Sequence, residues 1–270
     1  MGRDQDIVDE FLAGYNAHFG STFRIIERPD EVQRQKQAVD ALALDAVGQT
    51  LAIEHTLVQP FVGEKDDSRR FLTAIAPLEE DLSLRLPGIA YFVSLPVAAI
   101  PKGFDWAKIG KELRDWFLRV LSSIPEGTSL HKVPNVGFEL ALRIRKSQSP
   151  TTAGRILVLR SDMPDDFRQV VRKALKDKLP KLTKTRANIR ILLLELDNMP
   201  VSELEIADSL QAMKEEYPDL ATIDQIWSPV TVGRDIGCEY FATRVWPRSE
   251  AEWAIISVKC KPLSGADTVF

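Results

Sequence analysis

The chain begins with a clear hydrophobic pattern. Between Asp6 and Phe19 apolar side chains recur every three or four residues, and Gly20 follows the last of them. This spacing places the apolar side chains on one face of a helix, and glycine commonly stands just after a helix end. We therefore predict an amphipathic helix over Asp6–Phe19.

Two short apolar runs follow a polar, proline-containing stretch. The runs are DALALD, which begins at Asp40, and TLAIEHTLV, which begins at Thr50, and the segment AVGQ joins them. Short apolar runs on either side of a glycine-containing connection are typical of a β-hairpin. The sequence thus predicts two adjacent antiparallel strands.

Beyond Pro60 helical and strand-like patterns alternate. Helical spacing is found at 66–82, at 104–124, from 164 onward and at 202–217, and strand-like runs are found at 88–97, 136–144, 155–160, 189–196 and 221–230. This order predicts an α/β protein with a mixed β-sheet and flanking helices. We expect one domain over 1–270, with a C-terminal extension at 247–270 that shows no readable pattern.

The composition fits a globular protein, with 44% apolar and 27% charged residues. No apolar run reaches the ~18 residues that span a bilayer, and the acidic start is unlike a signal peptide, so we expect a cytoplasmic protein without a membrane partner. Cys238 and Cys260 form no CxxC pair, which argues against a zinc site or a disulfide framework. The net charge of -4 argues against a simple basic nucleic-acid-binding module but allows a locally basic cleft.

The predicted hairpin carries candidate metal ligands. Alternate side chains of a strand share a face, so Glu54 and Thr56 point to one side and His55 to the other. Asp40, at the start of the partner strand, can bring its carboxylate beside Glu54. Two such carboxylates suit Mg²⁺ or Mn²⁺, with water and substrate phosphate as the remaining ligands. The alternative is that Asp40 and Asp45 only mark strand ends while Glu54 lies on a solvated face.

The segments VDALALD and LAIEHT resemble the active-site hairpin of the PD-(D/E)XK nuclease superfamily. The resemblance implies a restriction-endonuclease-like core, with Asp40 as the first carboxylate and Glu54 as the second. The family lysine would fall at Thr56, which carries no charge, so the chain departs from the pattern there. The family often has a further glutamate on the preceding helix, and Glu10 would fill that place as a third metal ligand; the alternative is that Glu10 is a surface residue. A second match to the signature, ERPD, keeps Asp30 as the alternative to Asp40.

A lysine from another element is expected to replace the missing one. A later predicted helix places Lys178 at the end of its apolar stripe, where an unpaired ammonium is costly and the carboxylates of Asp40 and Glu54 are natural partners. Nuclease-like proteins related to the family often carry a lysine on a helix after the hairpin, so Lys178 is our candidate for the catalytic role missing at Thr56. Lys181 is the second choice. The alternative is that Lys178 only reaches past the helix end to water.

The same helix carries a strip of basic side chains. Seven lysines and arginines lie between Arg172 and Arg186, against one acidic residue. Cationic side chains supply most of the sequence-independent affinity for nucleic acid, so Lys173, Lys176 and Lys181 are candidate phosphate contacts. A solvated helix face is the other interpretation.

These features lead to competing functional hypotheses. The first is a metal-dependent nuclease that hydrolyses phosphodiester bonds of DNA or RNA, with Mg²⁺ or Mn²⁺ held by Asp40 and Glu54 and charge stabilised by Lys178. The second is a catalytically inactive nuclease-fold protein that binds nucleic acid or a protein partner. A third is a non-nuclease α/β domain whose acidic hairpin is incidental. Nucleic acid is the expected partner, and a homodimer is left open.

Overall fold

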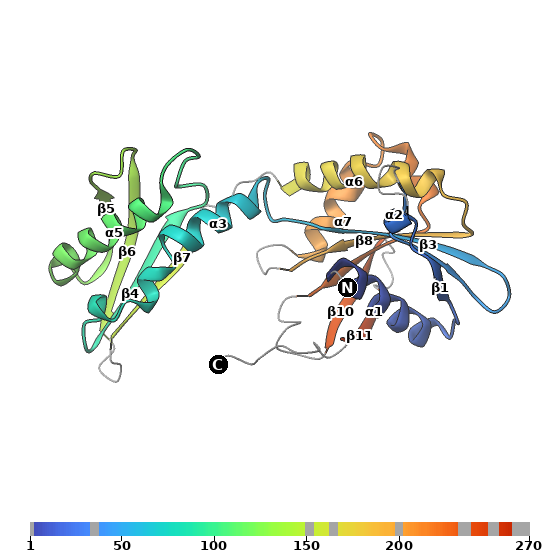
Figure 1. The fold of residues 1–270 in the computed structure, drawn as a ribbon, viewed down its shortest axis with the longest axis horizontal. Coiled ribbons are helices and arrows are strands. Elements are labelled where there is room, and N and C mark those ends of the chain that lie inside the picture. The colour runs from blue at the N-terminus through green and yellow to red at the C-terminus, as the bar shows by residue number, and fades with distance from the viewer. Residues whose placement is uncertain are drawn as a thin grey trace. The chain divides into compact units, whose positions relative to one another are not determined.

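The chain folds into two compact units. Unit 1 combines Met1–Val62 with Asp166–Phe270, and unit 2 is Gly63–Asp165, drawn from cyan to yellow-green in Figure 1. The computed structural model describes residues 3–32, 38–148, 154–161, 167–197, 202–231, 239–247 and 254–260. Each unit builds a sheet and an apolar core of its own, which is the physical definition of a domain. The expectation of a single domain over 1–270 did not anticipate this division.

Unit 1 contains a seven-stranded mixed sheet in the order β1-β2-β3-β8-β9-β10-β11. Its strands are β1 (Arg24–Glu27), β2 (Ala41–Leu44), β3 (Thr50–Leu57), β8 (Ile189–Glu195), β9 (Gln225–Val230), β10 (Glu239–Trp246) and β11 (Ile255–Lys259). The pairs β3–β8 and β8–β9 are parallel, and the other neighbouring pairs are antiparallel. The strand that carries Glu54, β3, therefore lies inside the sheet.

Helices cover both faces of this sheet (Figure 1). They are α1 (Arg3–Phe19), α2 (Pro29–Val32), α6 (Phe167–Lys184), α7 (Glu203–Ala212) and the 3-10 helix η3 (Pro218–Thr222). The α1 helix packs on one face with Leu51 and Ile53, whereas α6 and α7 pack on the other with Ala52. Because side chains alternate along a strand, even-numbered positions of β3 face α6 and odd-numbered positions face α1.

Local hydrogen bonds fix the turn between β2 and β3. Oδ1 of Asp45 accepts from the backbone N–H groups of Val47 at 2.9 Å and Gln49 at 2.8 Å. Gly48 has a φ of 86°, a left-handed conformation that glycine adopts without a steric penalty. Asp45 is therefore a turn residue, and this turn sets the register of the hairpin.

Unit 2 contains a four-stranded sheet in the order β5-β6-β4-β7. Its strands are β4 (Ile89–Pro96), β5 (Gly127–Val133), β6 (Leu140–Gln148) and β7 (Arg155–Ser161), and its helices are α3 (Glu64–Ala74), α4 (Pro77–Glu80), α5 (Trp106–Val120) and the 3-10 helices η1 (Leu82–Leu84) and η2 (Leu121–Ser123). Leu113 and Phe117 of α5 share one core with Tyr91 and Val93 of β4. This core is distinct from those of unit 1.

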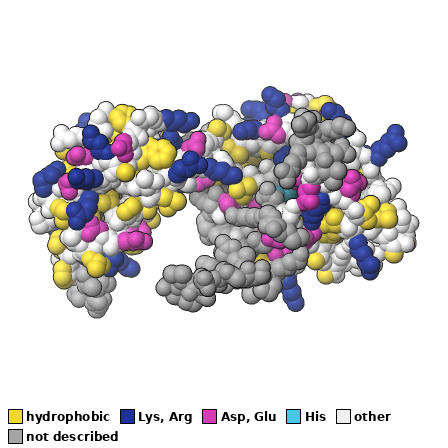
Figure 2. All heavy atoms as spheres, in the orientation of Figure 1, with side chains coloured by type: hydrophobic (Ala, Val, Ile, Leu, Met, Phe, Trp, Pro, Cys, Tyr) yellow, Lys and Arg dark blue, Asp and Glu magenta, His cyan; other side chains and the backbone are white. Residues whose placement is uncertain are grey.

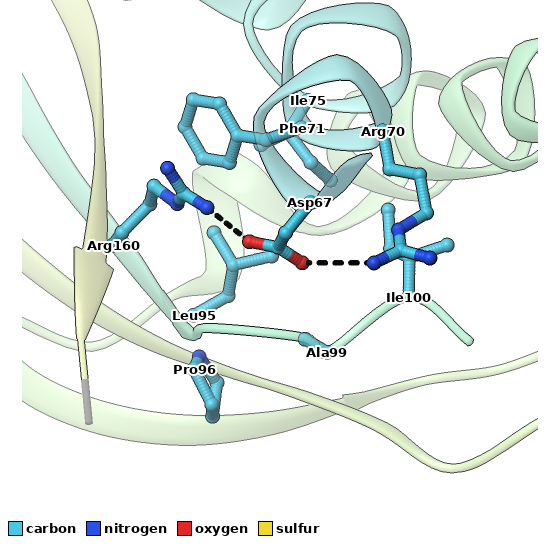
Figure 3. A pocket seen from close by; sticks show the side chains of 9 residues that line it. All are labelled: Asp67, Arg70, Phe71, Ile75, Leu95, Pro96, Ala99, Ile100 and Arg160. Atoms are coloured by element: carbon cyan, nitrogen blue, oxygen red, sulfur yellow. Dashed lines mark hydrogen bonds and ion pairs between the residues drawn. The ribbon is translucent and has the colours of Figure 1, made fainter. Parts of the chain in front are cut away.

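A buried carboxylate ties the elements of unit 2 together (Figure 3). Asp67 on α3 accepts a hydrogen bond from the backbone N–H of Ala98 at 2.9 Å. It also pairs with Arg160 on β7 and, at 3.6 Å, with Arg70 one turn along α3. The guanidinium carbon of Arg160 lies 5.5 Å from the centroid of the Phe71 ring. Since buried charges need partners, the network anchors the loop after β4 to α3.

The predicted fold class of mixed α/β type, with a mixed sheet and flanking helices, is confirmed. Four described strands, β1, β5, β10 and β11, were not predicted. Three of these, β1, β5 and β11, are edge strands, whose hydrophobic contrast is weak because they contact a neighbour on one side alone. The β11 strand lies within the 247–270 segment that had shown no pattern. The helix start expected near Pro164 falls outside the described residues.

Charged side chains of both signs are intermixed over the face of the molecule drawn in Figure 2. Together with the net charge of -4, this means that local arrangement decides where an anionic ligand would be attracted. Within the described ranges, no helix has the length and apolar character needed to cross a membrane.

Candidate functional site

The β2–β3 hairpin brings Asp40 and Glu54 side by side. The backbone N–H of Asp40 donates to Oε2 of Glu54 at 3.2 Å, and the backbone N–H of His55 donates to Oδ2 of Asp40 at 2.6 Å. Glu54 is thus held by the backbone of Asp40, and Asp40 is held by the backbone of the residue that follows Glu54. Glu54 is fully buried and Asp40 is half-buried. Glu54 occupies an even-numbered position of β3, so the pair lies on the face covered by α6.

Two lysines of α6 share one oxygen of Glu54. Nζ of Lys178 donates to Oε1 of Glu54 at 2.6 Å, and Nζ of Lys181 donates to the same oxygen at 2.8 Å. Both lysine side chains keep 20% of their surface exposed, whereas the Glu54 side chain keeps 0%. Residues three apart on a helix are neighbours on its surface, so the two lysines approach together. The two lysines therefore lie between the buried carboxylate of Glu54 and solvent.

Apolar packing fixes the position of these lysines. The buried stripe of α6 comprises Phe167, Val171, Leu175, Leu179 and Leu182. It shares a core with Ala52 of β3 and Leu192 of β8. The helix is therefore held on the sheet by its apolar side chains, and the ammonium groups reach Glu54 from a position that this core defines. Removal of either ammonium leaves the buried stripe of α6 in place.

The surroundings of the two carboxylates raise the pKa of both. Burial raises the pKa of Glu54, and the nearby charge of Asp40 raises it further, against the opposing effect of Lys178. Burial also raises the pKa of Asp40, partly offset by the hydrogen bond from the backbone of His55. For Lys181, burial alone would lower the pKa, but the hydrogen bond and charge of Glu54 outweigh it and raise the pKa. The ionised pair of carboxylates is therefore held at a cost, which a nearby cation reduces.

A second polar cluster lies on the opposite face of the same strand. Nε2 of His55 lies 2.9 Å from Oε2 of Glu195, and Oγ1 of Thr231 donates to Oε1 of Glu195 at 2.5 Å. All three side chains are buried. Because the backbone N–H of His55 binds Asp40, this cluster is linked through one residue to the carboxylate pair. His55 thus points away from Glu54, as the alternation of the strand predicted.

Glu10 does not join the carboxylate pair, unlike the arrangement expected from the sequence. It is 2% exposed and lies on α1, which packs against the sheet face opposite to α6. Across the described part of the chain, no group of three histidine, cysteine or acidic side chains is placed to hold a metal ion. The physical reason is the strand alternation that turns Glu54 toward α6 and away from α1.

Two further candidates from the sequence, Thr56 and Asp30, make no described contact with the carboxylate pair. Thr56 lies two residues beyond Glu54 on the same face of β3 and is half-buried. The ammonium groups at Glu54 come from α6 instead. Asp30 lies in the short helix α2, whereas Asp40 makes the contact with the backbone of His55. Asp40 is accordingly the aspartate that the fold pairs with Glu54.

Lys173 and Lys176 lie on α6 and are exposed. Neither forms an ion pair with a described residue, whereas their neighbour Arg172 pairs with Glu216 at 2.9 Å. The two free ammonium groups are therefore available to solvent, on the helix that also carries Lys178. Their placement is compatible with phosphate contacts and equally with a solvated surface.

Sequence reasoning missed Glu195 and Thr231. Glu195 stands at the end of the apolar run that forms β8, and an acidic residue at such a place is a signal that a partner is required. Its partners come from β3 and from the residue after β9, which no local pattern connects. Lys181 was ranked second, yet it contacts the same oxygen as Lys178.

No model of a known protein family matches the chain, and neither a curated protein nor a solved structure matches it.

Proposed function

We propose that the chain is a metal-dependent nuclease that hydrolyses phosphodiester bonds in DNA or RNA, and that unit 1 has a restriction-endonuclease-like core. The observation that carries this proposal is the meeting of Asp40, Glu54 and Lys178, although Lys178 lies 124 residues beyond Glu54. A buried ion pair that served stability alone would gain little, because desolvation commonly cancels the Coulombic attraction. Carboxylates whose pKa is raised by burial are typical of functional sites, and at Glu54 the charge of Asp40 raises the pKa further.

The donor set fits Mg²⁺ or Mn²⁺. Oδ1 of Asp40 accepts no hydrogen bond from the described residues, and Glu54 offers a neighbouring carboxylate. Magnesium usually takes one or two protein carboxylates and completes its ligands with water and substrate phosphate. Two carboxylates without a third acidic partner therefore suffice for this ion. When bound, the metal would polarise the phosphate and neutralise the charge that develops on it.

Lys178 takes the part of the lysine that is absent at Thr56. An ammonium group has three donors, and the contact with Oε1 of Glu54 uses one of them. The others are free to donate to a phosphate oxygen or to the attacking water beside the carboxylates. A fixed positive charge at this place stabilises the negative charge of the transition state. Lys181 has the same contact and supports the same role.

Substrate binding would use the exposed face of α6. Lys173 and Lys176 are exposed and lie on the helix that carries Lys178. Contacts from such lysines to the phosphate backbone position a strand without reading its sequence. Their expected effect is on affinity and its salt dependence, whereas Lys178 acts on the chemical step.

A cleavage assay tests the proposal directly. Labelled single-stranded and double-stranded DNA and RNA are incubated with the purified chain in Mg²⁺, in Mn²⁺ and in EDTA. We expect cleavage with a metal and none in EDTA, and loss of cleavage in Asp40→Asn and Glu54→Gln. The matched control is Asp177→Asn, which removes an exposed carboxylate from α6. If none of the four substrates is cleaved in Mg²⁺ or in Mn²⁺, the proposed nuclease function is wrong.

The departure at Thr56 supports a second candidate, a catalytically inactive protein that binds nucleic acid. Two ammonium groups pair with Oε1 of Glu54, which lowers the need of this carboxylate for a further cation. Glu10 supplies no third acid to the pair. The same assay separates the candidates, because an inactive protein should bind oligonucleotides without cleaving them, and equally well in Mg²⁺ and EDTA.

A further inference from the structure

The sheet of unit 2 has one apolar face that packs against helices and an opposite face that carries exposed leucines and arginines. Tyr91 and Val93 of β4 point into the core that α5 completes. The alternate side chains point the other way and include the half-buried Phe92 and the exposed Leu130 and Leu159. Leu130 keeps 68% and Leu159 keeps 51% of their surfaces exposed, so the described chain leaves at least half of each residue open to solvent.

Three arginines stand on the same face. Arg143 and Arg145 are exposed on β6, and Arg155 is exposed on β7. Arg145 lies opposite Phe92 on β4, and Arg143 lies opposite Leu130 on β5. None of the three arginines forms an ion pair with a described residue. Their charges are therefore available to a ligand.

Acidic residues are absent from the outward-facing positions of β4, β5, β6 and β7. Two acids flank the strands: Glu139, before β6, pairs with Lys132 at 2.7 Å, and Glu126, before β5, accepts a hydrogen bond from Gln148 at 3.4 Å. The positive charge of the arginines is consequently not balanced within the sheet face. A chain with a net charge of -4 thus carries a local surface that attracts polyanions.

The charges are interleaved with apolar surface. The guanidinium carbon of Arg145 lies 5.8 Å from the centroid of the Phe92 ring. Guanidinium planes and aromatic rings both stack on nucleobases, and this stacking tolerates any base. Leu130 and Leu159 add exposed apolar area in the neighbouring row of the sheet.

We propose that this face, defined by Phe92, Leu130, Arg143, Arg145, Arg155 and Leu159, binds single-stranded nucleic acid. The arginines supply contacts for phosphates, and the apolar side chains between them supply contacts for unpaired bases. A duplex would present phosphates to this face but would keep its bases stacked, so the apolar surface favours a single strand. The inference goes beyond the proposed cleavage function and does not depend on it, since a chain without nuclease activity would retain this surface.

Binding of short fluorescent oligonucleotides by the full chain tests the proposal. Fluorescence anisotropy is measured in EDTA with oligo-dT, oligo-U, a duplex of equal length and an oligo-glutamate peptide, over a range of salt concentrations. We expect the single strands to bind more tightly than the duplex and the peptide. The variant R143A/R145A/R155A should lose about tenfold or more in affinity, and its salt slope should fall by about 2, because each phosphate contact contributes about 0.7. The variant Phe92→Leu should lose about tenfold with an unchanged salt slope.

The matched control is K108A/K111A/R119A, which removes three exposed cations from α5 in the same unit. It should bind as the wild type does. Equal losses in both triple variants would overturn the proposal, because they would show a general charge effect. If oligo-glutamate binds as tightly as the single strands, the proposal is overturned in favour of an acidic protein partner. If the duplex binds as tightly as the single strands, the proposal is overturned because the apolar side chains then contact no unpaired bases. Circular dichroism of each variant confirms that unit 2 is folded. Cleavage by unit 1 is measured separately, so its absence leaves this result unaffected.

Discussion

Lys178 and Glu54 lie 124 residues apart in the chain, and their Nζ and Oε1 atoms meet at 2.6 Å. Unit 2 occupies much of the intervening sequence, yet the contact is made entirely within unit 1. It exists because the apolar stripe of α6 shares a core with β3 and β8. The polar site is therefore assembled by hydrophobic packing, and the charged groups can be altered while the core that positions them is kept.

Replacement of Lys178 should separate chemistry from folding. If the proposed function holds, Lys178→Ala should lower kcat by about 100-fold, because a fixed charge at the transition state is lost while the core stays intact. The protein should stay folded, with a moderate fall in melting temperature, because Lys181 still pairs with the buried Glu54 and the apolar stripe of α6 is unchanged. The matched control Lys173→Ala should change affinity and its salt dependence alone. Single-turnover cleavage and thermal unfolding give both readouts.

Lys181 contacts the same oxygen of Glu54 as Lys178, so the two lysines must be replaced singly and together. Both ammonium groups contact Oε1 of Glu54, so their effects should not be additive. We expect K178A/K181A to lose more activity than either single variant, and a double-mutant cycle measures the coupling. Full activity of Lys178→Ala together with inactive Lys181→Ala would transfer the role to Lys181. Full activity of the double variant would exclude both.

Binding of a divalent metal should stabilise unit 1. Mg²⁺ or Mn²⁺ at 100 times its dissociation constant should add about 2.7 kcal/mol to the free energy of unfolding, because the ion binds the folded carboxylate pair. Asp40→Asn should abolish this gain, and Asp177→Asn should retain it. Thermal unfolding in metal and in EDTA measures the difference. Equal melting temperatures for the wild type in both conditions would argue against a metal at this site.

The hairpin of β2 and β3 was predictable because its determinants are local. Asp45 and Gly48 encode the turn, and the apolar alternation of β3 places Glu54 and His55 on opposite faces. The contact of Lys178 with Glu54 was also anticipated, since a lysine at the end of a buried stripe needs a partner. Local rules sufficed where one element determined the direction of a side chain.

Two features could not be read from the sequence because they depend on contacts between distant segments. The pairing of Glu195 with His55 requires the parallel register of β3 and β8, which an unpaired strand does not reveal. The division into two units depends on which apolar faces pack together, and helices and strands alternate on both sides of the boundary at Gly63. Glu10 was misplaced for a related reason, since its helix covers the other face of the sheet.

The raised pKa values of Asp40 and Glu54 predict a pH dependence of stability. A carboxyl group whose pKa is higher in the folded state binds its proton more tightly there. The stabilisation that this tighter proton binding gives the folded state is therefore complete below the unfolded pKa of about 4. It is lost as the pH rises through the folded pKa. Asp40→Asn removes one such group, so its stability relative to the wild type should increase as the pH rises from 4 to 7. Urea unfolding at several pH values measures this difference, and a flat or falling difference would contradict it.

The last prediction concerns the buried cluster of His55, Glu195 and Thr231. Glu195→Ala leaves the His55 ring and the Thr231 hydroxyl without this partner in the core, so the free energy of unfolding should fall by about 2–4 kcal/mol. Glu195→Gln keeps a hydrogen-bonding side chain of the same shape and should lose less. If the proposed function holds, loosening β3 should also lower kcat, because the backbone of His55 holds Asp40, while KM should stay near its wild-type value, because the proposed phosphate contacts lie on α6. Activity is measured well below the melting temperature of each variant, so that unfolding does not enter the rate. If Glu195→Ala is destabilised but keeps its full kcat, the cluster serves the core alone, and Asp40 is positioned by the hairpin without help from the opposite face.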